Sequence, residues 1–444
     1  MFERLFRLSE HGTTVRTEVL AGVTTFLTMA YIVLVNPAIL HDAGLPGAAV
    51  AAATCLAAGV GCLLMGLLAN YPIALAPGMG LNAYFTYTVV KQMGVPWETA
   101  LGCVFISGAM FLVLTVAGIR QLIVRAIPRP LFAAVAAGVG LFIAFIGLRS
   151  AGIVTASPAT AVTLGDLHSP TALLALISLV VTAALLTWRV KGAILIGILA
   201  ASVAGWALGL AHWAPSPYSL TEMTATAFRL DIGGALGIGT GGIGGRGFTL
   251  GLLEILFVFL FVDLFDNVGT LVAVTKKANL VAEDGSIPRL NRVLTADSIA
   301  TMVGALAGTS TVVSYIESAS GVAEGGRTGL TAVVAGLLFL VTLFVAPWVQ
   351  AIPAAATAPA LILVGAMMMA PLAQVDWEDP GVAIPAFLTL VTIPLTFSIA
   401  NGLAFGITAF AALKLLRGKA GREDILLFAL AALFVARFAY LAVT

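Results

Sequence analysis

Stretches of about 20 apolar residues recur along the whole 444-residue chain, and each can cross a hydrocarbon core about 30 Å thick. Only 10% of the residues are charged, whereas a soluble domain carries about 25%. A membrane β-barrel would show short segments of alternating polarity, which these runs lack. The sequence therefore predicts an all-α polytopic membrane protein. The net charge of +1 does not indicate a nucleic-acid partner.

Positive charge sets the expected orientation of the spans. Lys and Arg cluster before the first span and after alternate later spans, which predicts a cytoplasmic N-terminus and a multi-pass protein of the cell membrane. The charged N-terminal segment does not resemble a cleaved signal peptide. The predicted spans are 18–40, 47–69, 72–90, 98–118, 130–149, 170–188, 192–211, 249–275, 293–308, 309–324, 328–348 and 356–373, then the shorter 382–397 and 400–416, and finally 424–443, which either spans or lies in the interface.

The chain contains an internal resemblance at a spacing of about 230 residues. Residues 125–142 resemble 350–367, and "ALAPGMGLNAYF" at 74–85 has a counterpart in "ALAGTSTVVSYIESASG" at 305–321. Seven spans in each half would turn the second half upside down, which is a common architecture of secondary transporters. Chance similarity between spans rich in small residues is the alternative explanation.

Both members of the second pair are poor continuous helices. The first carries Pro77, Gly78 and Gly80, and the second is rich in Ser, Thr and β-branched residues. Irregular backbone at membrane depth persists only where protein or a polar cavity supplies hydrogen-bond partners. We therefore predict an extended entry and a half-helix in each, with the helix N-termini near the bilayer midplane. The alternative is a pair of glycine-rich packing helices.

Acidic residues inside the predicted spans are candidate site residues, because an acid at mid-membrane is costly and usually faces a cavity. Asp263 and Asp266 of "FVDLFDNVGT" share one helix face, and Glu317 begins the second half-helix. Asn82 holds a similar place in the first half-helix. Asp266 and Asn82 also fit purely structural roles between helices.

Three further acids have simpler explanations. Asp297 is expected to cap its helix, and Glu254 and Glu324 lie near predicted span ends in water. The four histidines lie in loops or at span ends, so a transported proton would need a carboxylate. Cys55, Cys62 and Cys103 fall in apolar runs and are expected to be small buried side chains. No cofactor, disulfide or metal site is predicted.

Four motifs together resemble the AzgA-like purine permeases of the nucleobase:cation symporter (nucleobase–ascorbate transporter) group. They are "GVTTFLTMAYIVLVNP", "NYPIALAPGMGLNAYF", "FVDLFDNVGTLVAV" and "GTSTVVSYIESASGVAEGGRTGL". The resemblance implies a transporter rather than an enzyme, with fourteen transmembrane helices in two inverted repeats of seven. It also implies core and gate domains, an elevator-like shift between them, proton-coupled purine uptake and assembly into a homodimer.

The resemblance also assigns roles and domains by position. Asp263 and Glu317 match the acidic substrate-binding positions, Asn82 the polar residue of the first broken span, and Asp266 the second acid of the pair. The implied core domain covers 1–124 and 249–349, the gate domain 125–215 and 350–416, with an extramembrane loop at 216–248 and a C-terminal apolar segment at 417–444. The glycine-rich 237–247 lacks a "GK[ST]" ending and is interpreted as a linker.

Purine chemistry suits these groups. A carboxylate can accept hydrogen bonds from N1–H and the amine of guanine together, so Asp263 and Glu317 are expected at the donor edges of the base and Asn82 at a ring nitrogen. Tyr315 or Phe265 would stack on the ring. Hypoxanthine and guanine are favoured over adenine, which has an unprotonated N1. Protonation of Glu317 or Asp263, supported by Asp266, would couple transport to a proton, with sodium as the alternative ion.

Two other classes of protein fit less well. An anion carrier of the same architecture would need basic groups at the half-helices instead of acids. An intramembrane aspartyl protease would need its two acids on facing helices, whereas Asp263 and Asp266 share one helix.

Overall fold

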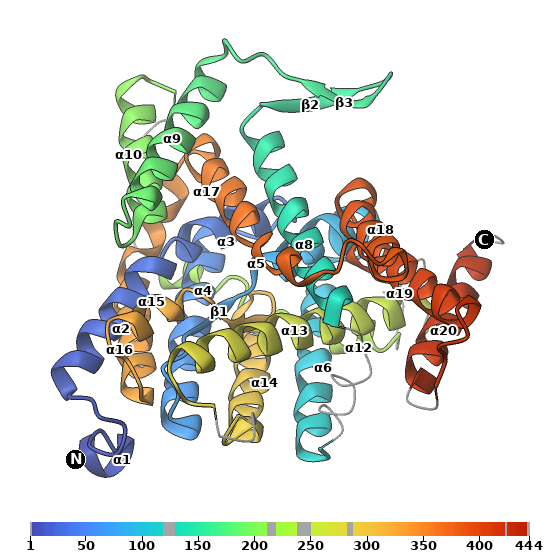
Figure 1. Cartoon of the computed structure of the whole chain (residues 1–444). Coiled ribbons are helices and arrows are strands. Elements are labelled where there is room, and N and C mark those ends of the chain that lie inside the picture. Colours follow the sequence, from blue (N-terminus) through green and yellow to red (C-terminus); the bar gives the residue numbers. More distant parts are fainter. Residues whose placement is uncertain are drawn as a thin grey trace.

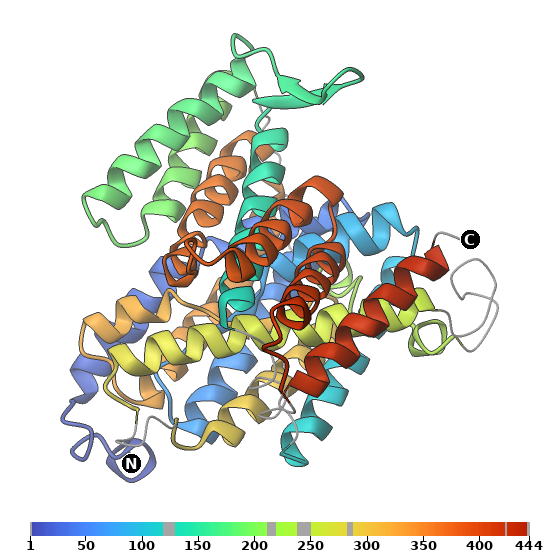
Figure 2. The same cartoon turned by 45° about the vertical axis from the view of Figure 1, so that its right-hand side comes forward.

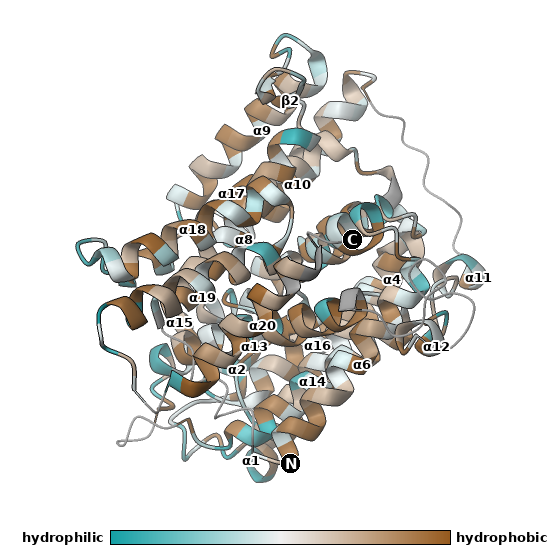
Figure 3. Cartoon of the chain, turned by 90° about the vertical axis from the view of Figure 1, so that its right-hand side faces the viewer, coloured by the Kyte–Doolittle hydropathy of each residue, from teal (hydrophilic) through white to brown (hydrophobic). Residues whose placement is uncertain are grey.

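Helices make up most of the protein, as the composition predicts. The computed structural model describes residues 2–118, 129–210, 219–237, 250–281, 287–421 and 424–441. Within these residues, nine helical segments are long and apolar enough to cross a membrane, and three shorter helices are also apolar. Figure 3 shows hydrophobic residues along most helices and hydrophilic residues mainly at helix ends and in loops. The polytopic helical fold is confirmed, whereas the count of fourteen stays a prediction.

One group of helices packs around α4, in the lower half of Figure 1. Helix α4 contacts α3, α14 and α16, while α2 packs on α16 and α6 packs on α14. The first predicted span forms two helices, α2 and α3, which meet at Ala30 and Tyr31. The members of this group are α2 (Val15–Met29), α3 (Ile32–His41), α4 (Gly47–Leu64), α6 (Trp97–Val116), α14 (Leu290–Ala307) and α16 (Gly329–Thr342).

A second group of helices packs around α8. Helix α8 contacts both α17 and α18, α18 and α19 form a tight hairpin, and α9 packs against α10 and α17. Figures 1 and 2 show α9 and α10 at one side of the molecule, with the β2–β3 hairpin to the right of their upper ends. The members are α8 (Arg129–Ser150), β2 (Val154–Ser157), β3 (Ala161–Leu164), α9 (Pro170–Thr187), α10 (Ala193–Ala207), α17 (Ala354–Met367), α18 (Pro380–Thr396), α19 (Ile399–Leu416) and α20 (Ile425–Leu441), which packs on α19.

Helix α13 (Leu250–Lys277) contacts both groups. It packs on α6 and more lightly on α8 and α19, and it runs at a steep angle to α6 and α14 in Figures 1 and 2. An ion pair of 2.8 Å between Lys191, in the α9–α10 loop, and Glu324 also joins the groups. These contacts define a seam between two packed bodies. The proposed core and gate boundaries stay a prediction.

The two interrupted segments have the predicted form. Strand β1 (Leu75–Pro77) precedes α5 (Met79–Ala83), and strand β4 (Val312–Ser314) precedes α15 (Ser318–Ala323). The strands pair antiparallel, with Leu75 opposite Ser314 and Pro77 opposite Val312. Each strand thus supplies hydrogen-bond partners for the other's exposed backbone, which explains how extended chain persists among apolar helices. The extended entries and half-helices are confirmed.

Shorter elements complete the chain. Helix α5 continues into a π-helical segment, Tyr84–Gln92, and α4 into another, Met65–Ala69. Tight 3₁₀ turns cover Leu343–Ala351 and Ala370–Gln374. The remaining short helices are α1 (Phe2–Phe6), α11 (Leu220–Met223) and α12 (Ile232–Ala235).

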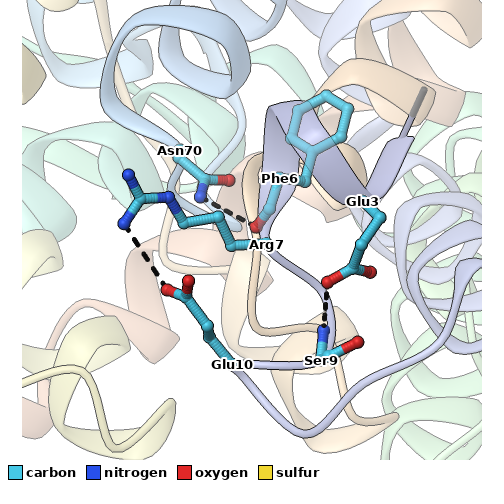
Figure 4. A network of polar contacts seen from close by, with 6 residues as sticks. All are labelled: Glu3, Phe6, Arg7, Ser9, Glu10 and Asn70. Carbon is cyan, nitrogen blue, oxygen red and sulfur yellow. Dashed lines mark hydrogen bonds and ion pairs between the residues drawn. The ribbon is translucent and has the colours of Figure 1, made fainter.

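Asn70 anchors the N-terminal segment beside the first broken span (Figure 4). Its left-handed backbone (φ 53°) ends the π-helical segment 65–69. Its amide nitrogen donates to the Phe6 carbonyl at 3.1 Å, and its amide oxygen accepts from the Gly329 N–H at 2.7 Å. Two local contacts, Ser9 N–H to Glu3 and the Arg7–Glu10 ion pair, fold the segment itself. One side chain therefore joins α1, the entry to β1 and the start of α16.

Candidate functional site

Glu317 occupies the N-cap position of α15, at the crossing of the two broken spans. Its side chain makes no capping bond; instead Oε1 accepts a hydrogen bond of 2.6 Å from the hydroxyl of Tyr31. Glu317 is half-buried, and the neighbouring Ile316 side chain is 45% exposed. The protein therefore leaves this side of the half-helix open while holding the carboxylate in place.

Helix α13 brings two acids to the same region in different ways. Asp266 is half-buried, and both Asp266 and Glu317 lie close enough to the Tyr315 hydroxyl to interact with it electrostatically. Asp263 is fully buried, and its Oδ1 accepts a 2.9 Å hydrogen bond from Asn267. Asn267 in turn accepts from the Ser314 N–H of β4 at 2.8 Å. Asp263 is thereby connected to the backbone of the second broken span, while Asp266 lies near Tyr315.

Tyr315 joins the two broken spans. Its side chain is buried, and its hydroxyl donates to the Pro77 carbonyl of β1 at 2.5 Å. Its backbone N–H donates to the Ala74 carbonyl at 3.0 Å. The ring thus lies beside the acids, where the predicted stacking on a substrate stays untested. The side chain of Phe265, the other predicted stacking residue, lies outside the described residues.

Asn82 lies in a buried amide network rather than beside Glu317. Its Nδ2 donates to Asn36 Oδ1 at 2.5 Å, and Asn36 Nδ2 donates to the hydroxyls of Thr54 and Thr309. All four side chains are fully buried. The network ties α5 to α3, α4 and the turn before β4. The Asn82 amide oxygen has no hydrogen-bond partner among the described residues.

The other predicted residues lie elsewhere. The prediction that Asp297 caps its helix is wrong, because α14 begins at Leu290 and Asp297 is fully buried inside it. Glu324 ends α15 at the surface, where it pairs with Lys191, and Glu254 is half-buried in α13. Cys55, Cys62 and Cys103 are buried free thiols, as predicted. Most of the glycine-rich 237–247 lies outside the described residues.

Sequence reasoning missed three polar partners of the site: Tyr31, Asn36 and Asn267. Tyr31 and Asn36 lie five residues apart in "YIVLVN", and Asn267 directly follows the Asp263/Asp266 pair. Each is a polar residue inside an apolar span, which is a signal for interhelical hydrogen bonding. The Asn267–Asp263 contact joins residues four apart on one helix, whereas the other contacts join segments from 18 to 286 residues apart and could not be read from the sequence.

Comparison with known proteins identifies the family. The sequence model of the permease family of xanthine and uracil carriers matches residues 16–405. The chain belongs to the xanthine/uracil permease family. This permease is 44% identical to the guanine/hypoxanthine permease PbuG of Bacillus subtilis over 445 residues (98% of this chain, 99% of that one). It is 42% identical to the adenine permease AdeP of Escherichia coli over 441 residues (99% and 96%).

A further relative and two solved structures complete the comparison. A protein of Methanocaldococcus jannaschii, named as a permease without a stated substrate, is 50% identical over 440 residues (99% and 98%). The transmembrane domain of the cyanobacterial bicarbonate transporter BicA has a similar fold (TM-score 0.59, 15% identity, 91% of this chain and 97% of that one). So does SLC26A9 (TM-score 0.62, 10% identity, 91% and 66%). The permease is therefore a multi-pass nucleobase transporter and not an enzyme.

Proposed function

We propose that this permease imports purine nucleobases together with protons, and that it prefers hypoxanthine and guanine. The observation that carries the proposal is the group of acids at the crossing of the broken spans: Glu317 at the start of α15, with Asp263 and Asp266 on α13. These acceptors suit the N–H groups of an oxopurine, and the backbone N–H groups of a half-helix N-terminus suit its carbonyl.

The proposed binding mode places the base against Glu317 and the face of α13 that carries the two aspartates. Glu317 accepts from one donor edge of the purine, and Asp263 accepts from another, since a carboxylate can accept several hydrogen bonds and Asn267 uses one of them. The Tyr315 ring stacks on the base, and Asn82 contributes its amide oxygen. Asp266 is the supporting acid in the electrostatic neighbourhood of Tyr315.

Proton coupling follows from the cost of moving charge through the membrane. A carboxylate at mid-membrane costs about 2.5–3.5 kcal/mol on insertion scales. Protonation of Glu317 from outside removes that charge, and bound purine satisfies the remaining polar groups. The helix group that carries the site can then slide along the seam past α8, α17 and α18. Deprotonation on the inner side releases the base.

Adenine is the second candidate substrate, because relatives with adenine and with guanine/hypoxanthine in their names are similar to this chain to nearly the same degree. Adenine presents an amine beside an unprotonated N1, so it would need one acid protonated while bound. The acids at the site favour the oxopurines. A cytoplasmic N-terminus, a location in the cell membrane and a homodimer belong to the same proposal.

Uptake measurements test the proposal. A bacterial strain without its own purine uptake should accumulate radiolabelled hypoxanthine when it expresses the permease, and guanine should compete better than adenine. An uncoupler should abolish accumulation, while replacing sodium by choline should not. Uptake without accumulation would indicate a channel, and persistence with the uncoupler would exclude proton coupling.

Matched variants test the site. Glu317→Gln and Asp263→Asn should abolish hypoxanthine uptake while the protein still reaches the membrane. Glu378→Gln is the control, because it neutralises an exposed acid that lies outside the site. Normal uptake by both site variants would refute the assignment.

A further inference from the structure

Tyr31 forms a hydrogen bond to Glu317, and the proposed function gives it no role. It lies where α2 ends and α3 begins, and its side chain is fully buried. Its hydroxyl donates to Glu317 Oε1 at 2.6 Å, the short distance expected of a hydroxyl bonded to an ionised carboxylate. The buried Tyr31 phenol therefore contacts Glu317, the acid that is proposed to bind the purine and to carry the proton.

Helix α2 packs against α15 and bonds to the turn and the start of α16 that follow it. At the far end, Glu18 of α2 accepts hydrogen bonds from the N–H groups of Arg327, Thr328 and Thr331 and from the Thr331 hydroxyl. In the middle, a Cβ on Gly321 would overlap the Ala21 carbonyl and the Thr25 hydroxyl, which shows how closely the helices pack. The close approach at Gly321 and the bonds to residues 327–331 keep α15 beside the end of α2 that carries Tyr31.

The other charged and titratable groups near Glu317 come from three elements. Asp266 on α13 and Tyr315 beside β4 face the same region, while Asp263 is connected to β4 through Asn267. At the far end of α15, Glu324 is paired with Lys191. Of these groups, Tyr31 is the one whose hydrogen bond to the Glu317 side chain the structure records.

We propose that Tyr31 is a positioning residue for coupling: its hydroxyl holds Glu317 as a fixed, ionised carboxylate and exchanges that bond when a proton and a purine arrive. A phenol can donate or accept. Towards ionised Glu317 it donates; once Glu317 carries a proton, the carboxylic O–H can donate to the phenol oxygen instead, so Tyr31 keeps the side chain in place in both protonation states. This proposal rests on the proposed function, because it gives Glu317 the proton.

The sign of the expected effect follows from which form of Glu317 the bond stabilises. Tyr31 stabilises the ionised form, so its hydroxyl opposes protonation. Without the hydroxyl, Glu317 stays protonated to a higher pH, and uptake should persist further into the alkaline range. A hydrogen bond to a charged group corresponds to a shift of about one pH unit.

The test is the pH profile of hypoxanthine uptake in Tyr31→Phe. The pH of half-maximal uptake should move about one unit to the alkaline side. Tyr71→Phe is the matched control, because Tyr71 is also fully buried and loses a hydroxyl that donates to the backbone carbonyl of Pro288 at 2.7 Å. Its profile should match the wild type. A profile of Tyr31→Phe that coincides with that of Tyr71→Phe overturns the proposal.

Two further measurements keep the test decisive. Should Tyr31→Phe fail to fold, 3-fluorotyrosine at position 31 keeps the ring and the bond but is a stronger donor, so the profile should move to the acidic side; no movement overturns the proposal. In purified protein, Tyr31→Phe should leave hypoxanthine affinity unchanged when Glu317→Gln is already present, since it acts through Glu317. A wild-type protein that transports no purine would instead refute the proposed function.

Discussion

The two broken spans both consist of a strand followed by a half-helix, but their polar residues differ in burial and in hydrogen-bond partners. In the first, Asn82 is fully buried and its amide nitrogen is used by Asn36. In the second, Glu317 is half-buried beside an exposed Ile316 and accepts from a hydroxyl. The first span is therefore built as an internal anchor and the second as the open, titratable side of the crossing.

The spans also differ in what they pack against. A Cβ on Gly80 of α5 would overlap Val139 of α8, in the other helix group, whereas a Cβ on Gly321 of α15 would overlap Ala21 and Thr25 of α2, in its own group. The half-helix that carries Asn82 faces the seam, and the one that carries Glu317 faces its own body. Two segments with the same backbone form can thus have different roles: α5 contacts the other helix group, and α15 carries the acid proposed to bind substrate.

The largest expected contrast compares Glu317→Gln with Asn82→Leu. Glu317→Gln should reduce uptake by about 100-fold or more, equivalent to roughly 2.7 kcal/mol, with an unchanged melting temperature. Asn82→Leu leaves the buried Asn36 amide oxygen without its donor, which costs about 1–3 kcal/mol, so stability and uptake should fall together. The measurements are hypoxanthine uptake per protein in the membrane and thermal unfolding in detergent. If both variants lose uptake at full stability, the division between anchor and open site is incorrect.

The form of both spans could be predicted from the sequence, because local chemistry decides it. Pro77 and the adjacent glycines cannot sustain a helix, and the Ser/Thr-rich 309–314 favours extended chain. Tyr31 could not be predicted as a partner of Glu317, because "TMAYIVLV" fits a uniform apolar helix and only tertiary packing decides which of its side chains meets α15.

Errors in helix boundaries explain another part of what was missed. The predicted span 293–308 put Asp297 near a helix end, where a cap is expected. The helix in fact starts at Leu290, so Asp297 falls a turn deeper and is buried. Asp263 and Asp266 were correctly expected on one helix face, yet their unequal burial depends on how α13 lies against β4, which no sequence pattern records.

Replacing Gly80 or Gly321 by alanine should have effects of intermediate size on uptake rate or stability. Gly80→Ala should slow uptake by about tenfold, since its Cβ meets Val139, a β-branched side chain with little freedom to move, and relief by shifting costs roughly 1–3 kcal/mol. Gly321→Ala should mainly lower the melting temperature, because its overlap lies within one body. Initial uptake rates and thermal unfolding of both variants separate these outcomes. Equal losses of stability with equal uptake would show that α5 does not slide against α8.

The smallest expected effect comes from breaking the hydrogen bond between Tyr315 and Pro77, which links the two broken spans. Tyr315→Phe removes the hydrogen bond from its hydroxyl to the Pro77 carbonyl, so the free energy of unfolding should fall by about 1 kcal/mol. The ring stays, so stacking on the purine and hypoxanthine affinity should be nearly unchanged. Tyr315→Leu removes the ring as well and should weaken hypoxanthine binding while guanine and hypoxanthine keep their relative order. Equal hypoxanthine affinities in the Phe and Leu variants would mean that Tyr315 holds the two spans together and does not touch the substrate.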